Sequence, residues 1–285
     1  MATEKKGVSE SEFARGIMDL DGAAEYKNIL LYGDSGCGKT VLAGTLPGRV
    51  LFLAGEPGYI SAARMGAKGK VRIIPDTATA VAAMSWLENG HASEFDWIVP
   101  DGLGTMQSKF LLGYAAEAFD ANPAKRAHRN LPDKPDYFNA QNFMKSWVSR
   151  LIDLPANVFF TAHAMRPEDE NGETLTYPAI QGKGYEVSNY ISGLMHGVWY
   201  MATRVKVEPD GEARQIRRLL FQHYVDSENG TRYFAKDQFN ALGRFATVRD
   251  PENPDGVTMP DLLALCDELP AEPKPKKARK LRAAA

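Results

Sequence analysis

The sequence has few cysteines, no long apolar run and no large excess of charge of either sign. Cys37 and Cys266 are the only cysteines among 285 residues, too few for a disulfide framework, so we expect a cytoplasmic protein. No apolar run reaches the roughly 18 residues of a membrane-spanning helix. The start, MATEKKGVSESEF, lacks the apolar stretch of a signal peptide. We therefore expect no membrane partner.

The nearly balanced charge hides an uneven distribution. The chain carries 34 basic and 36 acidic residues, for a net charge of −2, but the segment KPKKARKLR (274–282) holds six basic residues and no acidic one. A basic tail on an acidic body is typical of a protein that reaches a polyanionic partner through its tail. A solubilising, disordered end would have the same composition, and the sequence leaves both interpretations open.

Five short apolar runs alternate with helical patterns between residues 28 and 163. Such alternation predicts an α/β fold, with a mainly parallel sheet flanked by helices on both faces. The helical stretches include KTVLAGTL (39–46), which follows the first strand. The predicted strands are NILLYG (28–33), VLFLAG (50–55), VRIIPD (71–76), FDWIVPDG (95–102) and NVFFTAH (157–163).

The pattern changes after residue 164. A polar, glycine-containing stretch (164–184) predicts a long loop, which in a compact domain is usually functional or mobile. Two alternating runs on either side of Pro-Asp-Gly then predict a C-terminal β-hairpin. We divide the chain into a candidate oligomerisation arm (1–25), a core (26–245), an extension with a helix (246–270) and a basic, disordered tail (271–285).

A glycine-rich loop gives the strongest functional signal. The stretch GDSGCGKT matches G-x-x-x-x-G-K-[ST] in full, with a predicted strand before it and a helix after it. Glycines let backbone N–H groups surround phosphate oxygens, the lysine reaches the outer phosphates, and the threonine hydroxyl binds Mg²⁺. The alternative is a glycine-rich turn with an incidental lysine. The predicted nucleotide-binding residues are Gly33, Asp34, Ser35, Gly36, Cys37, Gly38, Lys39 and Thr40.

Two acidic residues follow predicted strands where a phosphate site would need them. Asp101 ends FDWIVPDG and is expected to bind hydrated Mg²⁺ together with Thr40, although Pro100 is unusual so late in a buried strand. Glu56 follows the second strand, where a carboxylate could orient the attacking water. Each has a plain alternative: Asp101 as a turn former before Gly102, and Glu56 as a surface turn residue.

The fifth predicted strand ends in polar residues. In NVFFTAH, Thr161 and His163 would face the γ-phosphate and sense whether ATP or ADP is bound. A single histidine can equally have a purely structural role.

Together these motifs resemble the RecA-type ATPase core, and more closely the phage-encoded RecA-like nucleotide-binding proteins, which include single-strand-annealing recombinases. YPAIQGKG (177–184) is similar to the Pro-x-x-x-Gly-Lys segment of that group. YFAKDQFNAL (233–242) resembles its Lys-x-Arg-Phe-Gly segment. The resemblance covers residues 26–245 and rests on the order of the motifs.

The resemblance implies ATP and Mg²⁺ as cofactors and assigns roles to several residues. With Lys39 at the phosphates, Glu56 would be the catalytic glutamate and His163 the γ-phosphate sensor. Lys236 would reach the ATP of a neighbouring subunit in a ring or filament. Gln238 departs from the family pattern, in which arginine is common, and a neutral amide stabilises transition-state charge less well than a guanidinium does.

The resemblance also implies partners. The N-terminal segment EFARGIMDL (12–20), with Phe13, could dock on the next subunit, although packing on its own core is the ordinary alternative. Residues 164–183 would correspond to the DNA-contacting loop. The loop around 121–136 is equally well explained as a solvated connection between helices. Candidate contacts for single-stranded DNA are Lys125, Arg126, Arg129, Arg166 and Lys183.

These observations predict an ATPase that acts on single-stranded DNA in phage recombination, annealing or repair, together with a replication or recombination protein of the phage or host. Two alternatives remain at this point. One is an ATP-dependent switch, loader or motor for a replication or packaging complex. The other is a small-molecule phosphotransferase, for which Arg126 and Arg129 would have to form part of a lid.

Overall fold

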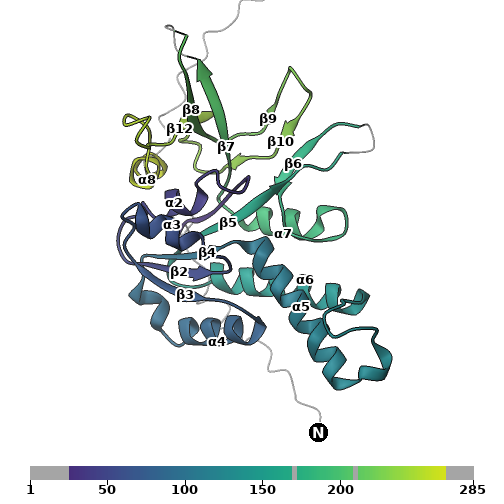
Figure 1. Ribbon diagram of the computed structural model, residues 1–285. Helices are drawn as coiled ribbons and strands as arrows, with labels where there is room; N and C mark the ends of the chain where they lie inside the picture. The colour runs from purple at the N-terminus through teal and green to yellow at the C-terminus, as the bar shows by residue number, and fades with distance from the viewer. Residues whose placement is uncertain (1–25, 169–171, 208–210, 268–285) are drawn as a thin grey trace, which may run out of the picture.

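A single large sheet with helices on both faces organises the chain (Figure 1). The computed structural model describes residues 26–168, 172–207 and 211–267. Six strands run parallel and two further strands extend the sheet in antiparallel fashion. In spatial order they are β3 (Lys70–Ile73), β2 (Val50–Ala54), β4 (Trp97–Asp101), β5 (Asn157–Met165), β1 (Asn28–Gly33), β7 (Gly197–Val207), β8 (Ala213–Leu220) and β12 (Phe245–Thr247).

The helices cover both faces of this sheet, as the alternation of apolar runs predicts. One face packs against α4 (Thr77–Glu88), α5 (Leu103–Ala121), α6 (Lys134–Ile152) and α7 (Glu186–Leu194). The other packs against α2 (Lys39–Ala43), α3 (Gly58–Arg64) and α8 (Met259–Asp267). The central strand β1 is buried on both sides, with Leu30 in one hydrophobic cluster and Ile29 in the other. A continuous apolar run is what a strand covered on both faces requires.

Short elements complete the fold. Beside the projecting β7–β8 hairpin (Figure 1), a small ladder joins β6 (Leu175–Pro178), β9 (Tyr224–Val225) and β10 (Arg232–Tyr233). β11 (Lys236–Asp237) pairs with β7. Three short 3₁₀ helices are η2 (His91–Glu94), η3 (Pro123–Lys125) and η4 (Lys183–Tyr185).

The α/β prediction with its parallel sheet and C-terminal hairpin is confirmed, and two local expectations are corrected. The helix after the glycine-rich loop ends at Ala43, because Gly44 begins a turn. The expected loop after residue 163 instead contains the end of β5 and the antiparallel strand β6. The predicted extension (246–270) contributes α8, whose Met259 and Leu262 are buried in the main core.

The predicted arm (1–25) and the whole of the predicted tail (271–285) lie outside the described residues. Among the helices of the described chain, none combines the length and the apolar character needed to cross a membrane.

Candidate active site at the glycine-rich loop

The loop between β1 and α2 has a backbone that only glycine accommodates at several points. Gly36 and Gly38 have φ angles of +76° and +107°, in the left-handed region that disfavours side chains. Gly33 lies so close to β7 that an added Cβ would come within 2.2 Å of the Met201 carbonyl oxygen. The glycine spacing therefore reflects the path of the backbone.

Lys39 begins α2 and turns back over this loop. Its ammonium group donates hydrogen bonds to the carbonyl oxygens of Gly33 (3.0 Å) and Asp34 (2.8 Å), and the residue is only 6% exposed. A buried ammonium needs partners of this kind. The positive charge is thus held at the mouth of the loop, where a phosphate would enter.

Asp101 and Thr40 meet beside the loop. The Thr40 hydroxyl lies 3.0 and 3.1 Å from the two carboxylate oxygens of Asp101, which is fully buried. Thr161 also donates to Asp101 (2.6 Å) and accepts a bond from the amide of Gly102 (2.8 Å). Two hydroxyl groups, one from α2 and one from β5, therefore fix the orientation of one carboxylate.

Pro100 accounts for the place where β4 and β5 stop pairing. The β4–β5 ladder ends at Ile98, whereas β4 continues to pair with β2 as far as Asp101. Proline lacks the N–H that further pairing would use. Beyond that point the Thr161 side chain links the two strands through Asp101 and the Gly102 amide.

Burial makes the charge of Asp101 costly in the folded protein. Burial raises the pKa of this carboxyl above its ordinary value, and the hydrogen bonds from Thr161 and Thr40 offset only part of that effect. A divalent cation at the same place would favour the ionised form. The site is therefore poised to gain electrostatic stability when a cation binds.

Glu56 lies on the other side of Asp101. Its carboxylate accepts a hydrogen bond from the Thr105 hydroxyl (3.1 Å) and lies 3.3 Å from His163 Nε2. Gly102 has a φ of +91°, and an added Cβ there would come within 3.0 Å of the Glu56 carboxyl carbon. Lys109 anchors the chain just before Glu56 through the Gly55 carbonyl oxygen (2.5 Å). Glu56 and His163 therefore form one polar unit beside the loop.

The residues around Thr40 fit a magnesium ion that is held together with a phosphate. Mg²⁺ in nucleotide sites usually takes one or two protein oxygens and completes its shell with water and phosphate. Thr40 and Asp101 provide such oxygens, and an added Cβ on Gly58 would come within 2.7 Å of the Thr40 hydroxyl oxygen. Within the described residues no group of three or more His, Cys, Asp or Glu side chains forms a separate metal site.

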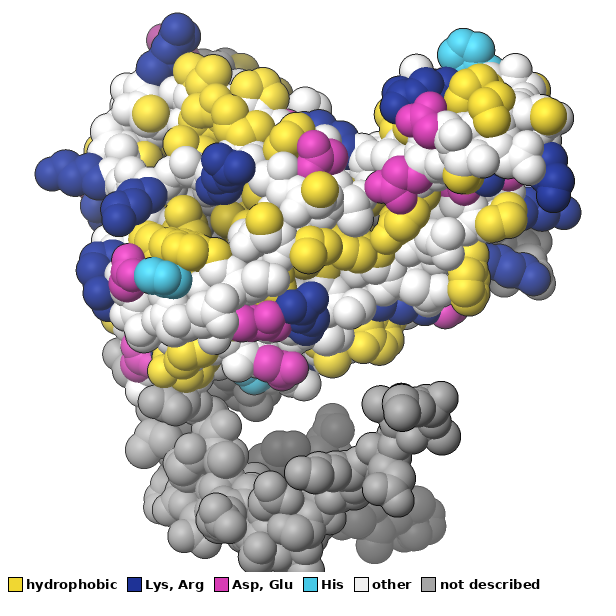
Figure 2. All heavy atoms as spheres, turned by 90° about the horizontal axis from the view of Figure 1, so that it is seen from below, with side chains coloured by type: hydrophobic (Ala, Val, Ile, Leu, Met, Phe, Trp, Pro, Cys, Tyr) yellow, Lys and Arg dark blue, Asp and Glu magenta, His cyan; other side chains and the backbone are white. Residues whose placement is uncertain are grey.

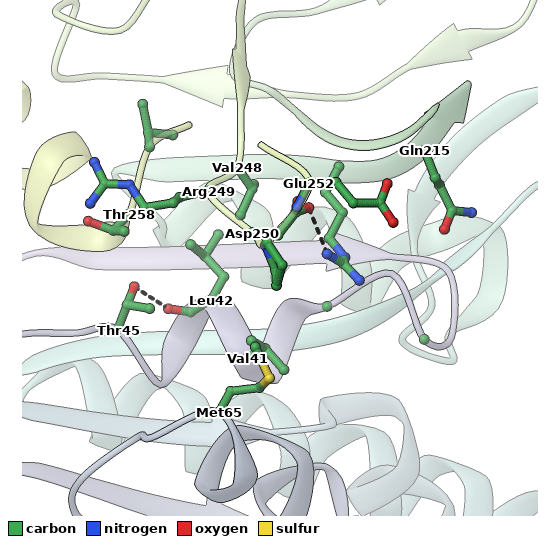
Figure 3. Close-up of a pocket in the computed structure, with 15 residues that line it drawn as sticks. Val41, Leu42, Thr45, Met65, Gln215, Val248, Arg249, Asp250, Glu252 and Thr258 are labelled. Atoms are coloured by element: carbon green, nitrogen blue, oxygen red, sulfur yellow. Dashed lines mark hydrogen bonds and ion pairs between the residues drawn. The ribbon is translucent and has the colours of Figure 1, made fainter. Parts of the chain in front are cut away.

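A cavity of about 400 Å³ continues from the glycine-rich loop along α2 (Figure 3). Its apolar floor comes from Val41, Leu42 and Met65, while residues 248–258 form the opposite wall. Arg217 closes one side, where its guanidinium donates to Asp250 (2.7 Å) and lies against Gly38. This size and mixed lining are typical of small-molecule sites.

Arg166 also reaches the glycine-rich loop, which the sequence did not indicate. Its guanidinium donates to the Asp34 carboxylate (2.6 Å) and to the Tyr200 hydroxyl (3.1 Å). The hydrogen bond from Arg166 holds the pKa of Asp34 below its ordinary value. The segment that follows β5 is thereby tied to the loop.

Other predicted residues lie away from this site. Lys236 caps the end of α7 by donating to the carbonyl oxygens of Ser192 (3.3 Å) and Gly193 (3.2 Å), so a contact with nucleotide could come only from a neighbouring subunit and stays a prediction. Arg126 is engaged by Asp136 and Arg129 by Asp120 (2.8 Å). Both arginines belong to the α5–α6 connection, well apart from α2 (Figure 1), so they form no lid over the loop. Lys125 and Lys183 are exposed.

A family model described as an AAA domain matches residues 25–239. The chain belongs to this AAA domain family. The match spans the glycine-rich loop, both acidic residues and His163, so the protein is a P-loop ATPase by family, and nucleotide hydrolysis is the activity that the family suggests. No curated protein matches the chain.

Solved structures also match this AAA domain protein. One is the crystal structure of a KaiC-like protein from the hyperthermophilic archaeon Pyrococcus horikoshii OT3, with 11% sequence identity and a TM-score of 0.36 over 73% of this chain and 89% of that chain.

Sequence reasoning missed several residues of the site. Thr105, Arg217 and Asp250 lie far from the glycine-rich loop in sequence and have no motif spacing of their own. Arg166 was predicted as a DNA contact, and its place at the glycine-rich loop was not anticipated. The cavity along α2 could not be anticipated either, because its second wall comes from residues 248–258, some 200 positions downstream of the first.

Proposed function

We propose that this AAA domain protein is a RecA-like ATPase that hydrolyses ATP while it acts on single-stranded DNA in phage-type recombination, annealing or repair. The observation that carries the catalytic part is the convergence of Thr40, Asp101 and the Glu56–His163 pair beside the glycine-rich loop. The action on DNA is supported by the resemblance of the motifs in their order along the chain.

Different residues of the site have different roles in the proposed hydrolysis. Amides of residues 33–40 and the Lys39 ammonium bind the phosphates and stabilise the charge that develops on them in the transition state. Glu56 orients a water molecule for attack and accepts its proton. His163, in contact with Glu56, responds to the presence of the terminal phosphate.

Thr40 and Asp101 hold the magnesium ion. When bound there, Mg²⁺ supplies positive charge that offsets the charge of the phosphates. Thr161 keeps the Asp101 carboxylate aimed at Thr40 by donating to it from β5. The cavity along α2 takes the nucleoside, with Val41, Leu42 and Met65 beneath the base.

Steady-state ATP hydrolysis, measured with and without a single-stranded oligonucleotide, tests this proposal. We expect Mg²⁺-dependent turnover that the oligonucleotide stimulates. Lys39→Ala should reduce turnover at least about 100-fold, because a buried cation that stabilises transition-state charge is lost. Lys68→Ala, at a lysine outside the site, is the matched control. An oligonucleotide that neither binds nor changes turnover would leave an ATPase without the proposed action on DNA.

We also propose that the protein self-associates through the edge strand β3. This strand ends the sheet, and its Val71 and Ile73 side chains are 46% and 51% exposed. A cavity of about 350 Å³ beside it is lined by apolar residues including Trp86. Figure 2 shows hydrophobic side chains gathered in several exposed groups among lysines and arginines on this side of the molecule. An unpaired edge with an apolar groove is suited to receive a strand from another chain.

The proposed occupant is the segment around Phe13 from a neighbouring copy, which is part of the 25 residues that precede the described chain. Sedimentation velocity with Mg²⁺ and ATP tests this. Val71→Glu should shift the protein to a smaller species, and deletion of residues 1–25 should have the same effect. Val205→Glu, at another exposed valine, is the control. If both the edge variant and the deletion kept the wild-type sedimentation coefficient, the proposed interface would be wrong.

A further inference from the structure

One face of the β7–β8 hairpin carries nearly all of its positive charge. Residues that pair across two strands share a face, and the register pairs Lys206 with Arg214 and Arg204 with Ile216. Neither strand contains an acidic residue. The opposite face has a single cation, Arg217, which is engaged by Asp250. The face that we call the cationic hairpin face carries Arg204, Lys206, Arg214 and Arg218.

A row of aromatic rings adjoins these cations. Phe245 on β12 is 37% exposed, and the Arg218 guanidinium lies 4.5 Å from the centre of its ring. Tyr224 meets Phe245 edge-on at 5.5 Å between ring centres, and Tyr233 stacks on Tyr224 at 6.1 Å. Tyr200 continues the row at 5.0 Å from Tyr233. An arginine beside an exposed ring, as in the pair Arg218 and Phe245, is a combination that can receive an unpaired base.

Two hollows open on this face. The larger, of about 610 Å³, is lined by Lys206, Arg214 and Arg218, with Asn253 and Asp255 on its far wall. The smaller, of about 40 Å³, is lined by Arg204 and by tyrosines of the aromatic row. Arg218 and Phe245 belong to both. The two hollows therefore adjoin at Arg218 and Phe245, between the cations and the rings.

We propose that the cationic hairpin face binds single-stranded nucleic acid, with phosphates along the four cations and bases stacked on Phe245 and Arg218. This inference rests on the proposed function and gives its nucleic acid a place. A duplex would meet the cations but would keep its bases stacked within the helix, away from the rings. An acidic peptide would need the cations and not the rings. A loss of affinity when a ring is removed therefore distinguishes single-stranded nucleic acid from a duplex or an acidic peptide.

The face is connected to the ATPase site. The hairpin projects from the body at the end of the molecule opposite α4 (Figure 1). The aromatic row ends at Tyr200, whose hydroxyl accepts a hydrogen bond from Arg166, and Arg166 is bound to Asp34 of the glycine-rich loop. A nucleic acid bound to the hairpin would thus be connected to the nucleotide site through the aromatic row, Tyr200 and Arg166.

Fluorescence anisotropy of labelled oligo-dT and oligo-U with the full chain tests the proposal. The variant Arg204→Gln/Lys206→Gln/Arg218→Gln should bind at least about tenfold more weakly, and its salt slope should fall by about 2, since each phosphate contact contributes roughly 0.7. Phe245→Leu should weaken binding about five- to tenfold at unchanged charge, because a stacking contact is lost. The two oligonucleotides distinguish DNA from RNA.

A matched control removes the same number of charges away from the hairpin and from every other candidate contact, as Arg64→Gln/Lys68→Gln/Arg150→Gln, and should bind like the wild type. Nucleotide binding is measured for each variant to show that it is folded. The single variant Arg204→Gln is included because it disturbs the hairpin less than the triple variant does. Wild-type affinity in the triple hairpin variant would overturn this inference and leave the proposed function standing. Loss in the charge variant with none in Phe245→Leu would indicate an acidic partner or a duplex instead. Absence of binding by the wild type itself would contradict both.

Discussion

The nucleotide site and the cationic hairpin face both use positive charge, but they hold it in opposite ways. Lys39 is buried and donates to two backbone carbonyl groups, and the carboxylate beside it is fixed by two hydroxyl groups. Arg204 and Lys206 are exposed on a projecting strand. Buried, oriented charges suit chemistry on one small phosphate group, because they need no reorganisation during the reaction. Exposed cations suit a long polyanion, whose binding gains from counterion release.

The largest expected effect is a loss of ATP turnover that leaves the cationic hairpin face unaffected. Glu56→Gln removes the group that orients water while it preserves size and the contact with Thr105. We expect turnover to fall about 100- to 1000-fold, in the range of general-base removal, with nucleotide affinity and oligonucleotide affinity within about threefold of the wild type. ATP turnover and calorimetry measure this, with Glu88→Gln as the control. If Glu56→Gln hydrolysed ATP at the wild-type rate, the glutamate would have no catalytic role.

Salt should affect the two regions unequally. If four cations contact phosphates, raising KCl from about 50 to about 200 mM should weaken oligo-dT binding roughly 50-fold. Binding of Mg²⁺ with ATP should change much less, because buried groups are screened less than exposed ones. Parallel titrations of both ligands measure the contrast. Equal sensitivity of the two ligands would contradict the distinction drawn between the regions.

Arg166 is the contact that joins the regions. Arg166→Ala removes the bridge between Asp34 and Tyr200, and we expect stimulation of turnover by oligonucleotide to fall about tenfold, which corresponds to a coupling energy of about 1.4 kcal/mol. Basal turnover and oligonucleotide affinity should each change less than the stimulation does. Arg232→Ala, at an arginine on β10, serves as the control. Undiminished stimulation would show that the coupling follows another route.

The smallest effect is one of stability. Because burial raises the pKa of Asp101, the unfolded chain releases this proton at a lower pH than the folded protein does. Asp101 therefore costs stability as the pH rises above the unfolded pKa of about 3.9. Asp101→Asn should raise the melting temperature of the nucleotide-free protein by a few degrees, about 3 °C, at pH 7. The gain should vanish near pH 3.5.

The same substitution should abolish the stabilisation that Mg²⁺ and ATP give together, since the amide is a poor magnesium ligand. Thermal melts at both pH values, with and without ligand, measure both effects. A nucleotide-free variant that melted below the wild type at pH 7 would mean that the charge of Asp101 stabilises the fold.

Particular residues show how far local pattern reached. The glycine-rich loop and the parallel strands were predictable, because φ requirements and burial on both faces act within a few residues. Glu56 and Asp101 were predictable as strand-end residues, since parallel strands end at one edge of a sheet. The sequence pattern predicts a loop where the end of β5 pairs with β6, because this pairing depends on a contact between the two strands and not on a local apolar run. The ion pairs of Arg126 with Asp136 and of Arg129 with Asp120 could not be predicted from the local pattern either.

The sequence by itself determined the P-loop, the parallel sheet and the identity of the groups available for chemistry, since these depend on residue type, spacing and alternation. Only the tertiary structure decided that Thr161 would orient Asp101, that Arg166 would reach Asp34, and that the cations of the hairpin would share one face with Phe245. The two hydrogen bonds join residues that are 60 and 132 positions apart in the sequence. Contacts between such distant residues depend on the order and register of the strands, which no local pattern specifies.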